Sequence, residues 1–291
     1  MKRKIQRIAI LGYPRDVNLF LTHKILYEWL TKQQYNVVVE SGIARFLNLN
    51  SVNTATLEQI GEKCDLGIVI GGDGNMLCVL RTLSYYPINI IGVNCGNLGF
   101  LTDLNPDNMI NMLSCILSGE YFLEKRFLLE VSIYHEKIQK NSFAVNEIIL
   151  HAGKNVHMIE FAVYIDKFFA FSQRADGIII STPTGSTGYA LSAGGPILST
   201  SSNVVVIVPM FPHTLSSRPI VVSSNDKIML KIFDCDNKAK ISCDGQCKFS
   251  VFEKDKVMIY KSKNFINLIH PKNYHYLNVL RKKLCWSKNF F

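Results

Sequence analysis

Residues 66–77 read Leu66-Gly-Ile-Val-Ile-Gly-Gly-Asp-Gly-Asn-Met-Leu77, and this stretch decides how the first half of the chain folds. The run Leu66–Ile70 is short, apolar and bounded by glycine, which predicts a buried strand. The residues from Met76 to Leu83 predict the start of a helix. Asp73 therefore sits on a tight glycine turn at the carboxyl end of a strand, where open α/β sheets bind their ligands.

The glycines around Asp73 predict a loop that lets a bulky anion approach the backbone. Gly71 and Gly72 are candidate phosphate-loop residues, because such a turn presents free N–H groups. The carboxylate of Asp73 suits a different task, accepting a hydroxyl proton or holding a cation. The chain contains neither a G-x-x-x-x-G-K-[ST] loop nor a G-x-G-x-x-G fingerprint. Taken alone, the motif is equally typical of a β-turn with a surface aspartate.

Length and composition predict a globular protein of one large or two ordinary domains. The chain has 291 residues, of which 48% are hydrophobic and 19% charged. No apolar stretch approaches the roughly 20 residues of a membrane span, so we expect no membrane partner. The start, Met1 to Lys4, leads directly into an apolar strand and not into a signal peptide. Eight cysteines without a C-x-x-C pair are interpreted as mostly small core residues in a reducing cytosol, which predicts a cytoplasmic protein.

The net charge of +9 raises the question of an acidic partner. The basic residues are dispersed, with one modest cluster at Arg281-Lys-Lys283. This pattern favours a small polyphosphate over nucleic acid, and we expect no nucleic-acid partner. A nucleic-acid-binding module is the alternative, and it rests on charge alone.

The two halves of the chain differ in pattern. Strands are expected at 8–12, 36–39, 66–70 and 88–93, alternating with helices at 18–32, 54–63 and 106–117, which predicts an α/β fold with a mainly parallel sheet. After Gly119, strands are expected at 127–134, 143–150, 157–165, 168–174, 177–181, 204–208, 227–233, 238–243 and 256–261. They predict an all-β, sandwich-like domain. The expected organisation is an α/β domain at 1–120, an all-β domain at 121–270 and a tail at 271–291 with helix-like spacing.

A second motif, Thr182-Pro-Thr-Gly-Ser-Thr-Gly-Tyr-Ala-Leu-Ser-Ala-Gly-Gly-Pro196, interrupts the β half. Ser186 or Thr187 is expected to cap a helix that opens toward Leu191, and such an N-terminus suits phosphate. Tyr189, with the apolar residues after it, suits a pocket for a flat aromatic ring. The alternative is a flexible polar loop, and the density of small residues favours the ligand interpretation.

Further polar residues are candidates for the same site, each with a structural alternative. Asn146-Glu147 interrupts an apolar strand, as a ligand contact or as part of an edge strand. Arg174 and Asp176 share one face of a strand, either as an ion pair or as separate ligand contacts. His157 is a further candidate, although a lone histidine is more often structural. The segment from Ser242 to Gln246 is typical of a tight turn between strands.

These segments together resemble the NAD kinase family, in its bacterial form. The matching segments occur in the family's order: Gly71–Leu77, Asn94–Leu101, Val145–Glu147, Ala175–Tyr189, Pro212–Pro219, Cys243–Gln246 and Leu277–Arg281. The Gly-Gly-Asp-Gly turn is also found in 6-phosphofructokinases and in diacylglycerol or sphingosine kinases. The long run Ala175–Tyr189 is specific, and the resemblance covers nearly the whole chain.

The resemblance implies transfer of a phosphoryl group from ATP, with a divalent cation that is most often magnesium, to the 2′-hydroxyl of the adenosine ribose of NAD. Asp73 would be the catalytic residue, as general base or as the group that orients the hydroxyl. The implied NAD site consists of Asp73, Gly74, Asn146, Glu147, His157, Arg174, Asp176, Thr187, Gly188, Tyr189, Ala190, Leu191, Ser192 and Gln246. The metal ligands stay open. The resemblance also implies a homodimer or homotetramer, with a tail that returns to the N-terminal domain.

Two other functions compete with this one. A lipid kinase of the diacylglycerol type would share the Gly-Gly-Asp-Gly turn, but the sequence has no amphipathic membrane face. A non-catalytic NAD sensor would use the same pocket, but a sensor needs no base, and Asp73 is intact.

Overall fold

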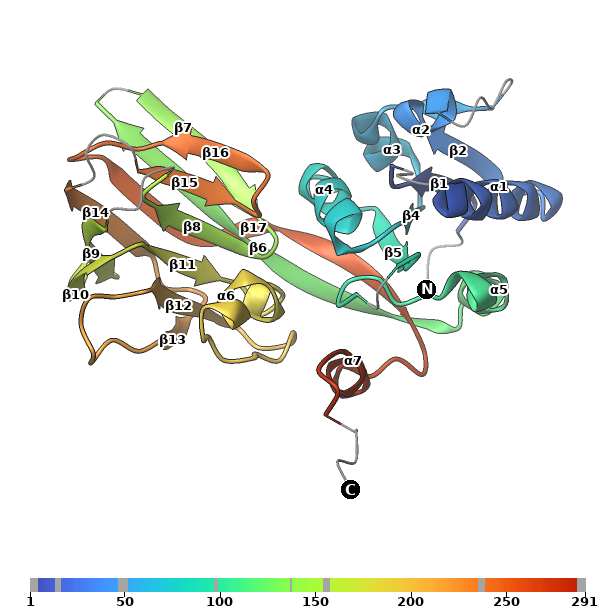
Figure 1. Cartoon of the computed structure of the whole chain (residues 1–291). Helices are drawn as coiled ribbons and strands as arrows, with labels where there is room; N and C mark the ends of the chain where they lie inside the picture. Colours follow the sequence, from blue (N-terminus) through green and yellow to red (C-terminus); the bar gives the residue numbers. More distant parts are fainter. Residues whose placement is uncertain are drawn as a thin grey trace. The chain divides into compact units, whose positions relative to one another are not determined.

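The chain forms two compact units. The computed structural model describes residues 5–13, 17–46, 52–96, 99–136, 138–153, 158–234 and 239–286. Unit 1 comprises Met1–Lys125 and Ile266–Phe291, and unit 2 comprises Arg126–Phe265. The chain passes from unit 1 to unit 2 along β6 (Tyr121–His135) and returns along β17 (Lys256–Pro271) (Figure 1). The predicted domain boundaries, 120/121 and 270/271, stay a prediction.

Unit 1 is built on a parallel sheet, as the α/β pattern predicts. Its strands lie in the order β5-β4-β1-β2-β3 and are β1 (Arg7–Leu11), β2 (Asn36–Glu40), β3 (Thr54–Ala55), β4 (Leu66–Ile70) and β5 (Asn89–Val93). The last part of β17 lies parallel to β5, with Asn267 opposite Asn89. This pairing brings the C-terminal segment into unit 1.

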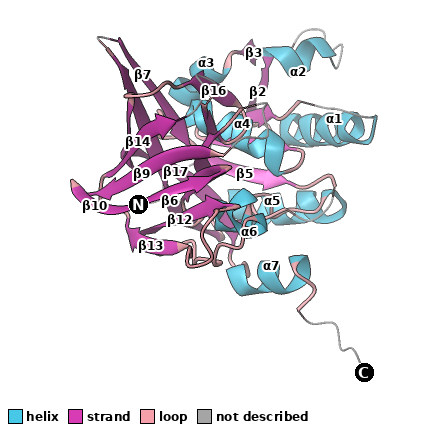
Figure 2. Cartoon of the chain, turned by 60° about the vertical axis from the view of Figure 1, so that its left-hand side comes forward, coloured by secondary structure: helices cyan, strands magenta, loops and turns pink. Residues whose placement is uncertain are grey.

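Six α-helices lie in the described part of unit 1, and α1 and α5 bury apolar residues against this sheet (Figure 2). They are α1 (Val17–Lys32), α2 (Ser41–Phe46), α3 (Leu57–Lys63), α4 (Asp73–Leu83), α5 (Met109–Leu117) and α7 (Tyr276–Lys283). Leu26 of α1 and Leu113 of α5 share one fully buried cluster with Ile8 and Ile68 of the sheet. In α1 the buried residues Leu19, Leu26 and Leu30 recur at helical spacing, so one face of the helix packs against the sheet.

The single helix expected over 54–63 is wrong in its first turn. Thr54–Ala55 pairs with β2 as a short strand, and the helix begins at Leu57. The side chain of Thr56 accepts a hydrogen bond from the Gln59 backbone, and the Gln59 side chain accepts one from the Thr56 backbone. This reciprocal cap fixes where the helix starts.

Unit 2 is all-β, as predicted, and consists of antiparallel strands. One sheet has the order β13-β12-β11-β8-β15-β16, formed by β8 (Glu147–His151), β11 (Gly177–Ser181), β12 (Val204–Met210), β13 (Ile220–Ser223), β15 (Lys240–Cys243) and β16 (Cys247–Ser250). The other strands are β7 (Ile138–Ala144), β9 (Ile159–Ile165), β10 (Phe168–Ala175) and β14 (Ile228–Asp234), with the adjoining parts of β6 and β17. Phe161 of β9 and Ile178 of β11 belong to one buried cluster, so the two sets of strands share a core.

The most informative departure from the predicted strands lies at residues 145–146. The single strand expected over 143–150 is wrong, because β7 ends at Ala144 and β8 begins at Glu147. The backbone between them donates its hydrogen bonds to a side chain and not to a neighbouring strand. Two strands, β13 and β16, were not expected, and β17 runs ten residues beyond its predicted end at 261.

The expectation that most cysteines are core residues is wrong for three of the seven that the structure describes, while Cys95 and Cys247 are half-buried against the cores. Cys64 and Cys243 are buried, whereas Cys78, Cys115 and Cys285 are exposed. Cys78 and Cys115 lie on the solvent faces of α4 and α5, whose buried faces are formed by larger aliphatic residues.

No helix among the described residues is long and apolar enough to span a membrane.

Candidate functional site

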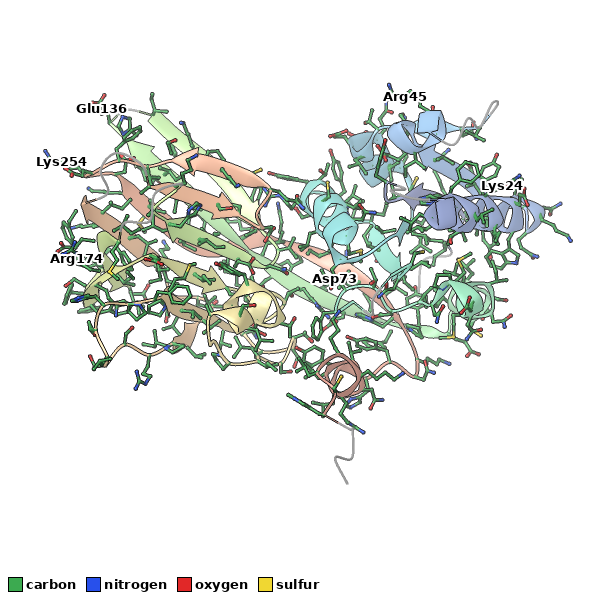
Figure 3. All side chains as sticks on the ribbon, in the orientation of Figure 1. Lys24, Arg45, Asp73, Glu136, Arg174 and Lys254 are labelled. Atoms are coloured by element: carbon green, nitrogen blue, oxygen red, sulfur yellow. The ribbon has the colours of Figure 1, made fainter. Side chains whose placement is uncertain are left out.

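Asp73 lies where the sequence predicts, directly after the buried strand β4. All five residues of β4 are buried, and Gly71 follows with φ of 142°, a conformation that favours glycine. Gly72 is the N-cap of α4, so Asp73 is the first residue of that helix (Figure 3). A carboxylate at this position interacts favourably with the helix dipole. Gly72 and Gly74 are exposed, and a Cβ atom on either would meet no atom within 4 Å.

The carboxylate of Asp73 is held by the segment that follows β5. The backbone N–H groups of Phe100 and Leu101 donate to its two oxygens, at 2.8 and 3.1 Å. The hydroxyl of Thr102 donates to Oδ1 at 3.4 Å. A Cβ atom on Gly99 would lie only 2.1 Å from the same oxygen, so this position has room for glycine alone. The sequence did not reveal these partners, and they fix the direction of the carboxylate.

A second cluster of candidate residues forms in unit 2 around the break between β7 and β8. The carboxylate of Asp244 accepts hydrogen bonds from the backbone of Val145, Asn146 and Glu147, at 2.8, 2.8 and 3.1 Å. The Asp244 N–H in turn donates to the Glu147 carbonyl at 3.0 Å. Asp244 has φ of 51° in the turn before Gly245, a conformation that aspartate tolerates. The predicted tight turn is confirmed, and its aspartate anchors the segment that carries Asn146.

Asn146 and Glu147 present buried oxygens without hydrogen-bond partners. Oδ1 of Asn146 and Oε2 of Glu147 have none in the structure. Burial, reinforced by the nearby charge of Asp244, raises the pKa of Glu147 from its ordinary value of 4.5 to about 8. A buried polar atom without a partner is costly, so both oxygens call for hydrogen-bonding groups from outside the protein. The edge-strand alternative for these residues is wrong, because β8 lies between β11 and β15.

The glycine-rich segment lies beside these oxygens. A Cβ atom on Gly188 would lie 3.3 Å from Oε2 of Glu147 and 3.4 Å from Nδ2 of Asn146. Gly185 is packed against the backbone of Asn146, and its missing Cβ would be 2.3 Å from that carbonyl oxygen. The hydroxyl of Thr182 donates to the Val145 carbonyl at 2.7 Å. The two segments are therefore one unit of structure, which excludes a flexible loop.

The helix expected after Ser186 or Thr187 differs from the prediction. Residues 185–187 form one 3₁₀ turn, and α6 (Tyr189–Ser192) has only four residues, with Gly188 as an N-cap that makes no side-chain bond. The Ser186 hydroxyl is used elsewhere, since it donates to the Pro183 carbonyl and accepts from the Leu198 N–H. The Thr187 hydroxyl donates to the Thr184 carbonyl at 3.3 Å. The predicted cap is wrong because both hydroxyls bind their own segment.

The residues of α6 take different positions. Tyr189 has 45% of its surface exposed, and Ser192 is exposed as well. Leu191 is half-buried. Ala190 is fully buried in a cluster with Ile179 and Val206, so its methyl group faces the protein core and not a ring pocket. Tyr189 is the aromatic side chain of α6 that a ligand can reach.

Arg174 and Asp176 lie away from this cluster. Gly177 pairs with His151 and Ser181 pairs with Glu147, so the Asp176 end of β11 is about 13 Å from the Glu147 end, at 3.3 Å per residue. Arg174, labelled in Figure 3, is exposed on β10. In the described part of the chain it forms no ion pair with Asp176. The ion-pair alternative is wrong.

Gln246 is exposed beside the Asp244 turn, and His157 lies outside the described residues.

Comparison with known proteins places this geometry in context. Residues 8–121 match the family described as ATP-NAD kinase N-terminal domain, and residues 145–271 match ATP-NAD kinase C-terminal domain. The NAD kinase of Buchnera aphidicola subsp. Schizaphis graminum is 56% identical over 292 residues, covering 100% of both chains. The NAD kinase of Salmonella choleraesuis is 53% identical, also over 100% of both chains.

Solved structures share the fold. Yeast NADH kinase, crystallised with NADH, superposes with a TM-score of 0.89 at 23% identity, over 100% of this chain and 90% of that one. An NAD kinase from Archaeoglobus fulgidus in complex with ATP gives a TM-score of 0.74 at 27% identity, over 97% of this chain and 100% of that one.

Proposed function

This chain belongs to the NAD kinase family, and on that premise we propose which of its residues carry the reaction. The activity is that of an NAD kinase, the transfer of a phosphoryl group from ATP to NAD to give NADP. The relatives cover the whole chain at 51–56% identity, so the lipid-kinase, sensor and nucleic-acid alternatives are set aside.

The two unpartnered oxygens of Asn146 and Glu147 are the observation that carries the NAD site. Both are buried and without partners, and a ribose offers adjacent hydroxyl groups that can donate and accept hydrogen bonds. Gly188 leaves room for a ligand beside them, because any larger residue would fill the space next to Oε2 of Glu147. Tyr189 provides an exposed ring at the same end of the sheet for stacking on a flat base. We therefore assign NAD binding in unit 2 to Asn146, Glu147, Gly188 and Tyr189.

Asp73 is the proposed catalytic residue. Its carboxylate accepts hydrogen bonds from the backbone after β5, and an acceptor held in this way is fixed in direction. Each carboxylate oxygen has more than one lone pair, so Asp73 retains capacity to accept the proton of a substrate hydroxyl. Phosphoryl transfer needs positioning and charge neutralisation more than covalent chemistry from the protein. Orientation of the 2′-hydroxyl is the role that this geometry suits.

Magnesium is proposed to arrive with the donor nucleotide. Among the described residues, no three His, Cys, Asp or Glu side chains are grouped to hold a metal ion. Magnesium commonly binds through substrate phosphates and one or two carboxylates, and Asp73 fits the part of such a carboxylate. When bound, the ion would neutralise charge on the transferred phosphoryl group.

A homodimer or homotetramer is the proposed assembly. Strand β13 pairs with β12 alone within the described sheet, which leaves an open edge. Ile220 and Val221 of that strand are 39% and 44% exposed, and Leu215 before it is 96% exposed. An exposed apolar edge favours pairing with another chain. Light scattering on wild type and Val221→Lys tests this: the variant is expected to shift toward smaller species, and an unchanged mass would place the interface elsewhere.

Cytoplasmic location stays a prediction from the sequence.

The decisive assay uses purified protein, NAD, ATP and magnesium, with NADP detected through a coupled dehydrogenase. The regiochemistry is tested with an NAD analogue that lacks the adenosine 2′-hydroxyl. This analogue is expected to bind with a loss of about 0.5–1.5 kcal/mol, one ordinary hydrogen bond, and to give no phosphorylated product. The analogue that lacks the nicotinamide-ribose 2′-hydroxyl is expected to remain a substrate. Product from the first analogue would show that another hydroxyl is the acceptor.

A further inference from the structure

His270, near the end of β17, connects two carboxylates of unit 1. Its side chain is 1% exposed, and those of Asp103 and Glu124 are 8% and 16% exposed. Nδ1 of His270 is bound to Oδ2 of Asp103, and Nε2 is 2.8 Å from Oε2 of Glu124. Because an ionised carboxylate only accepts, both ring nitrogens donate, as in the imidazolium form. His270 therefore ties β17 to the segment after β5 and to the start of β6.

Aromatic rings hold the plane of this imidazole. The centre of the His270 ring lies 4.1 Å from that of Tyr274 and 5.0 Å from that of Phe122. The ring planes differ by only 24° and 28°, so both contacts are stacked. A stacked ring cannot turn without losing these contacts, and the two nitrogens of His270 therefore keep their directions.

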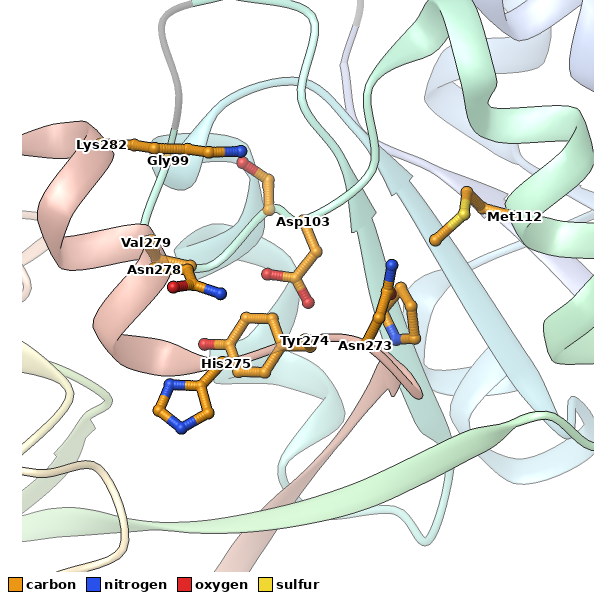
Figure 4. A pocket seen from close by; sticks show the side chains of 11 residues that line it. Gly99, Asp103, Met112, Asn273, Tyr274, His275, Asn278, Val279 and Lys282 are labelled. Carbon is orange, nitrogen blue, oxygen red and sulfur yellow. The ribbon is translucent and has the colours of Figure 1, made fainter.

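Asp103 directly follows the residues that hold Asp73. Residues 100–102 donate three hydrogen bonds to the carboxylate of Asp73, two from backbone N–H groups at 2.8 and 3.1 Å and one from a hydroxyl at 3.4 Å. The carboxylate of Asp103 points toward the ring of Tyr274, in a cavity of about 350 Å³ that both residues line (Figure 4). One side-chain bond thus separates His270 from the segment that directs Asp73.

The backbone joins the same segment to β5. The N–H groups of Asp103 and Leu104 donate to the Gly92 carbonyl at 3.2 and 3.1 Å, and the Asn94 N–H donates to the Leu104 carbonyl at 2.7 Å. These bonds connect the segment to one strand, whereas the side chain of Asp103 connects it to β17 through His270. The segment is therefore held from two directions.

We propose that His270 is a positioning residue for the carboxylate of Asp73 and acts through Asp103. The inference rests on the proposed function, because it names what sets the direction of the proposed catalytic group. Without the imidazolium, the carboxylates of Asp103 and Glu124 would face each other with like charge in a buried place, which is unfavourable. Asp103 would then move, and residues 100–102 would move with it. Misplacing a catalytic group by about 1 Å costs on the order of 10²-fold in rate.

Two substitutions of His270 separate its two bonds. Counted along the side chain from Cβ, the amide nitrogen of asparagine takes the place of Nδ1, and that of glutamine takes the place of Nε2. His270→Asn therefore keeps a donor for Asp103 and loses the bond to Glu124, whereas His270→Gln does the opposite.

Steady-state kinetics in the full-length enzyme compare these two variants. The kcat of His270→Gln is expected to fall at least about tenfold below wild type, and that of His270→Asn is expected to stay within about threefold. The KM values for NAD and ATP are expected to stay near wild type in both, because the substitutions touch the direction of Asp73 and not a substrate contact. Equal kcat values for the two variants would overturn the proposal.

His135→Gln is the matched control. Nδ1 of His135 lies 2.6 Å from Oδ1 of Asp255, and its ring centre lies 5.0 Å from that of Phe252, but this pair belongs to unit 2. Glutamine removes the bond at Nδ1 here as well, so the control should lose stability and keep its kcat. A kcat as low as that of His270→Gln would overturn the proposal, since any lost bond between a histidine and a carboxylate would then have the same effect.

Hydrogen exchange provides a readout that needs no turnover. The N–H groups of Phe100 and Leu101 are bound to Asp73, so their exchange rates report on this contact directly. Exchange is expected to be at least about tenfold faster in His270→Gln than in His270→Asn, and equal rates would overturn the proposal. If neither variant folds, Asp103→Ala removes the same bond from the other side. A wild-type kcat and wild-type exchange in Asp103→Ala would overturn the proposal equally.

Failure of this proposal and failure of the proposed function give different results. Near-normal turnover of Asp73→Asn, together with faster exchange in His270→Gln, would contradict the catalytic role of Asp73 and support the link through Asp103. Lost turnover in Asp73→Asn, with unchanged kcat and unchanged exchange in His270→Gln, would overturn the role of His270 and leave the proposed function intact.

Discussion

Oδ1 of Asp244 lies 2.8 Å from the backbone nitrogen of Asn146, although 98 residues separate the two in the chain. The same carboxylate binds the N–H groups on either side of Asn146. The aspartate of one turn thus holds the break between two strands open, and the side chains of Asn146 and Glu147 project from that break. The geometry of the proposed NAD site in unit 2 depends on this contact.

Asp244→Asn is expected to weaken NAD binding and to lower stability. The amide keeps one acceptor oxygen but places an NH₂ group against a backbone N–H, which costs about 1–3 kcal/mol. Asparagine tolerates the left-handed backbone at this position. A loss of stability would therefore come from the changed hydrogen bonds and not from backbone strain. The KM for NAD and the denaturant midpoint check the prediction. Asp166→Asn is the control, because Asp166 also has positive φ and accepts a backbone N–H, but in an exposed turn. An unchanged KM for NAD in Asp244→Asn would exclude the positioning role.

Gly99→Ala is expected to lower turnover more than it lowers stability. The new methyl group would overlap Oδ1 of Asp73 and the hydroxyl of Thr102, so the carboxylate must turn away from its present direction. Misplacing a catalytic group by about 1 Å costs on the order of 10²-fold in rate. Gly96→Ala is the matched control, since a Cβ atom at Gly96 meets no atom within 4 Å. If both variants have the wild-type kcat, Asp73 does not need its present orientation.

Asp73→Asn is expected to lower kcat by roughly 10²–10⁴-fold, the usual effect of removing a positioned base. It is also expected to destabilise the protein by about 1–3 kcal/mol, because the amide keeps one acceptor oxygen but places its NH₂ group against one of the two backbone N–H groups that Asp73 binds. Asp65→Asn is the control for removing an aspartate charge from unit 1: Asp65 accepts the N–H groups of Gln6 and Arg7 on one oxygen, Oδ2, which an amide oxygen can replace. The control should keep its kcat. Near-normal turnover of folded Asp73→Asn protein would rule out the catalytic role.

Glu147 is expected to make the free protein less stable as the pH rises from about 4.5 to about 8. The unfolded chain loses the glutamate proton near 4.5, whereas burial keeps it bound in the folded state up to about 8. Between these values the folded state binds more protons than the unfolded state, so the free energy of unfolding falls with rising pH. Glu147→Gln removes this titration. Between pH 5 and pH 9 its free energy of unfolding is therefore expected to rise by about 2–4 kcal/mol relative to that of wild type.

Urea denaturation at both pH values measures this difference. Glu253→Gln, which alters an exposed carboxylate of the same unit, should follow wild type at each pH. If the free energy of unfolding changes by the same amount from pH 5 to pH 9 in wild type and in Glu147→Gln, then Glu147 is already ionised at neutral pH in the folded protein.

The sequence by itself determined the elements whose signal is local. The strands Leu66–Ile70 and Gly177–Ser181 have the predicted bounds, because each is a short apolar run closed by turn-forming residues. The glycine turn before Asp73 is likewise local, since backbone conformation at Gly71 depends on the residue itself. The alternation of strands and helices in one half and of strands alone in the other also predicted both fold classes.

Tertiary structure alone decided how the polar side chains are used. The break at Val145–Asn146 exists because a carboxylate from a distant turn replaces a neighbouring strand as acceptor, and no local pattern encodes that replacement. Ala190 belongs to the core because α6 packs it against Ile179 and Val206. Arg174 lies at the end of β10, and the residues after it enter β11 at the end opposite Glu147. Asp73 binds the segment at residues 100–102 because β4 and β5 are neighbours in the sheet, and their carboxyl ends meet. Hydrogen bonds between segments far apart in sequence depend on distances that only the folded chain creates.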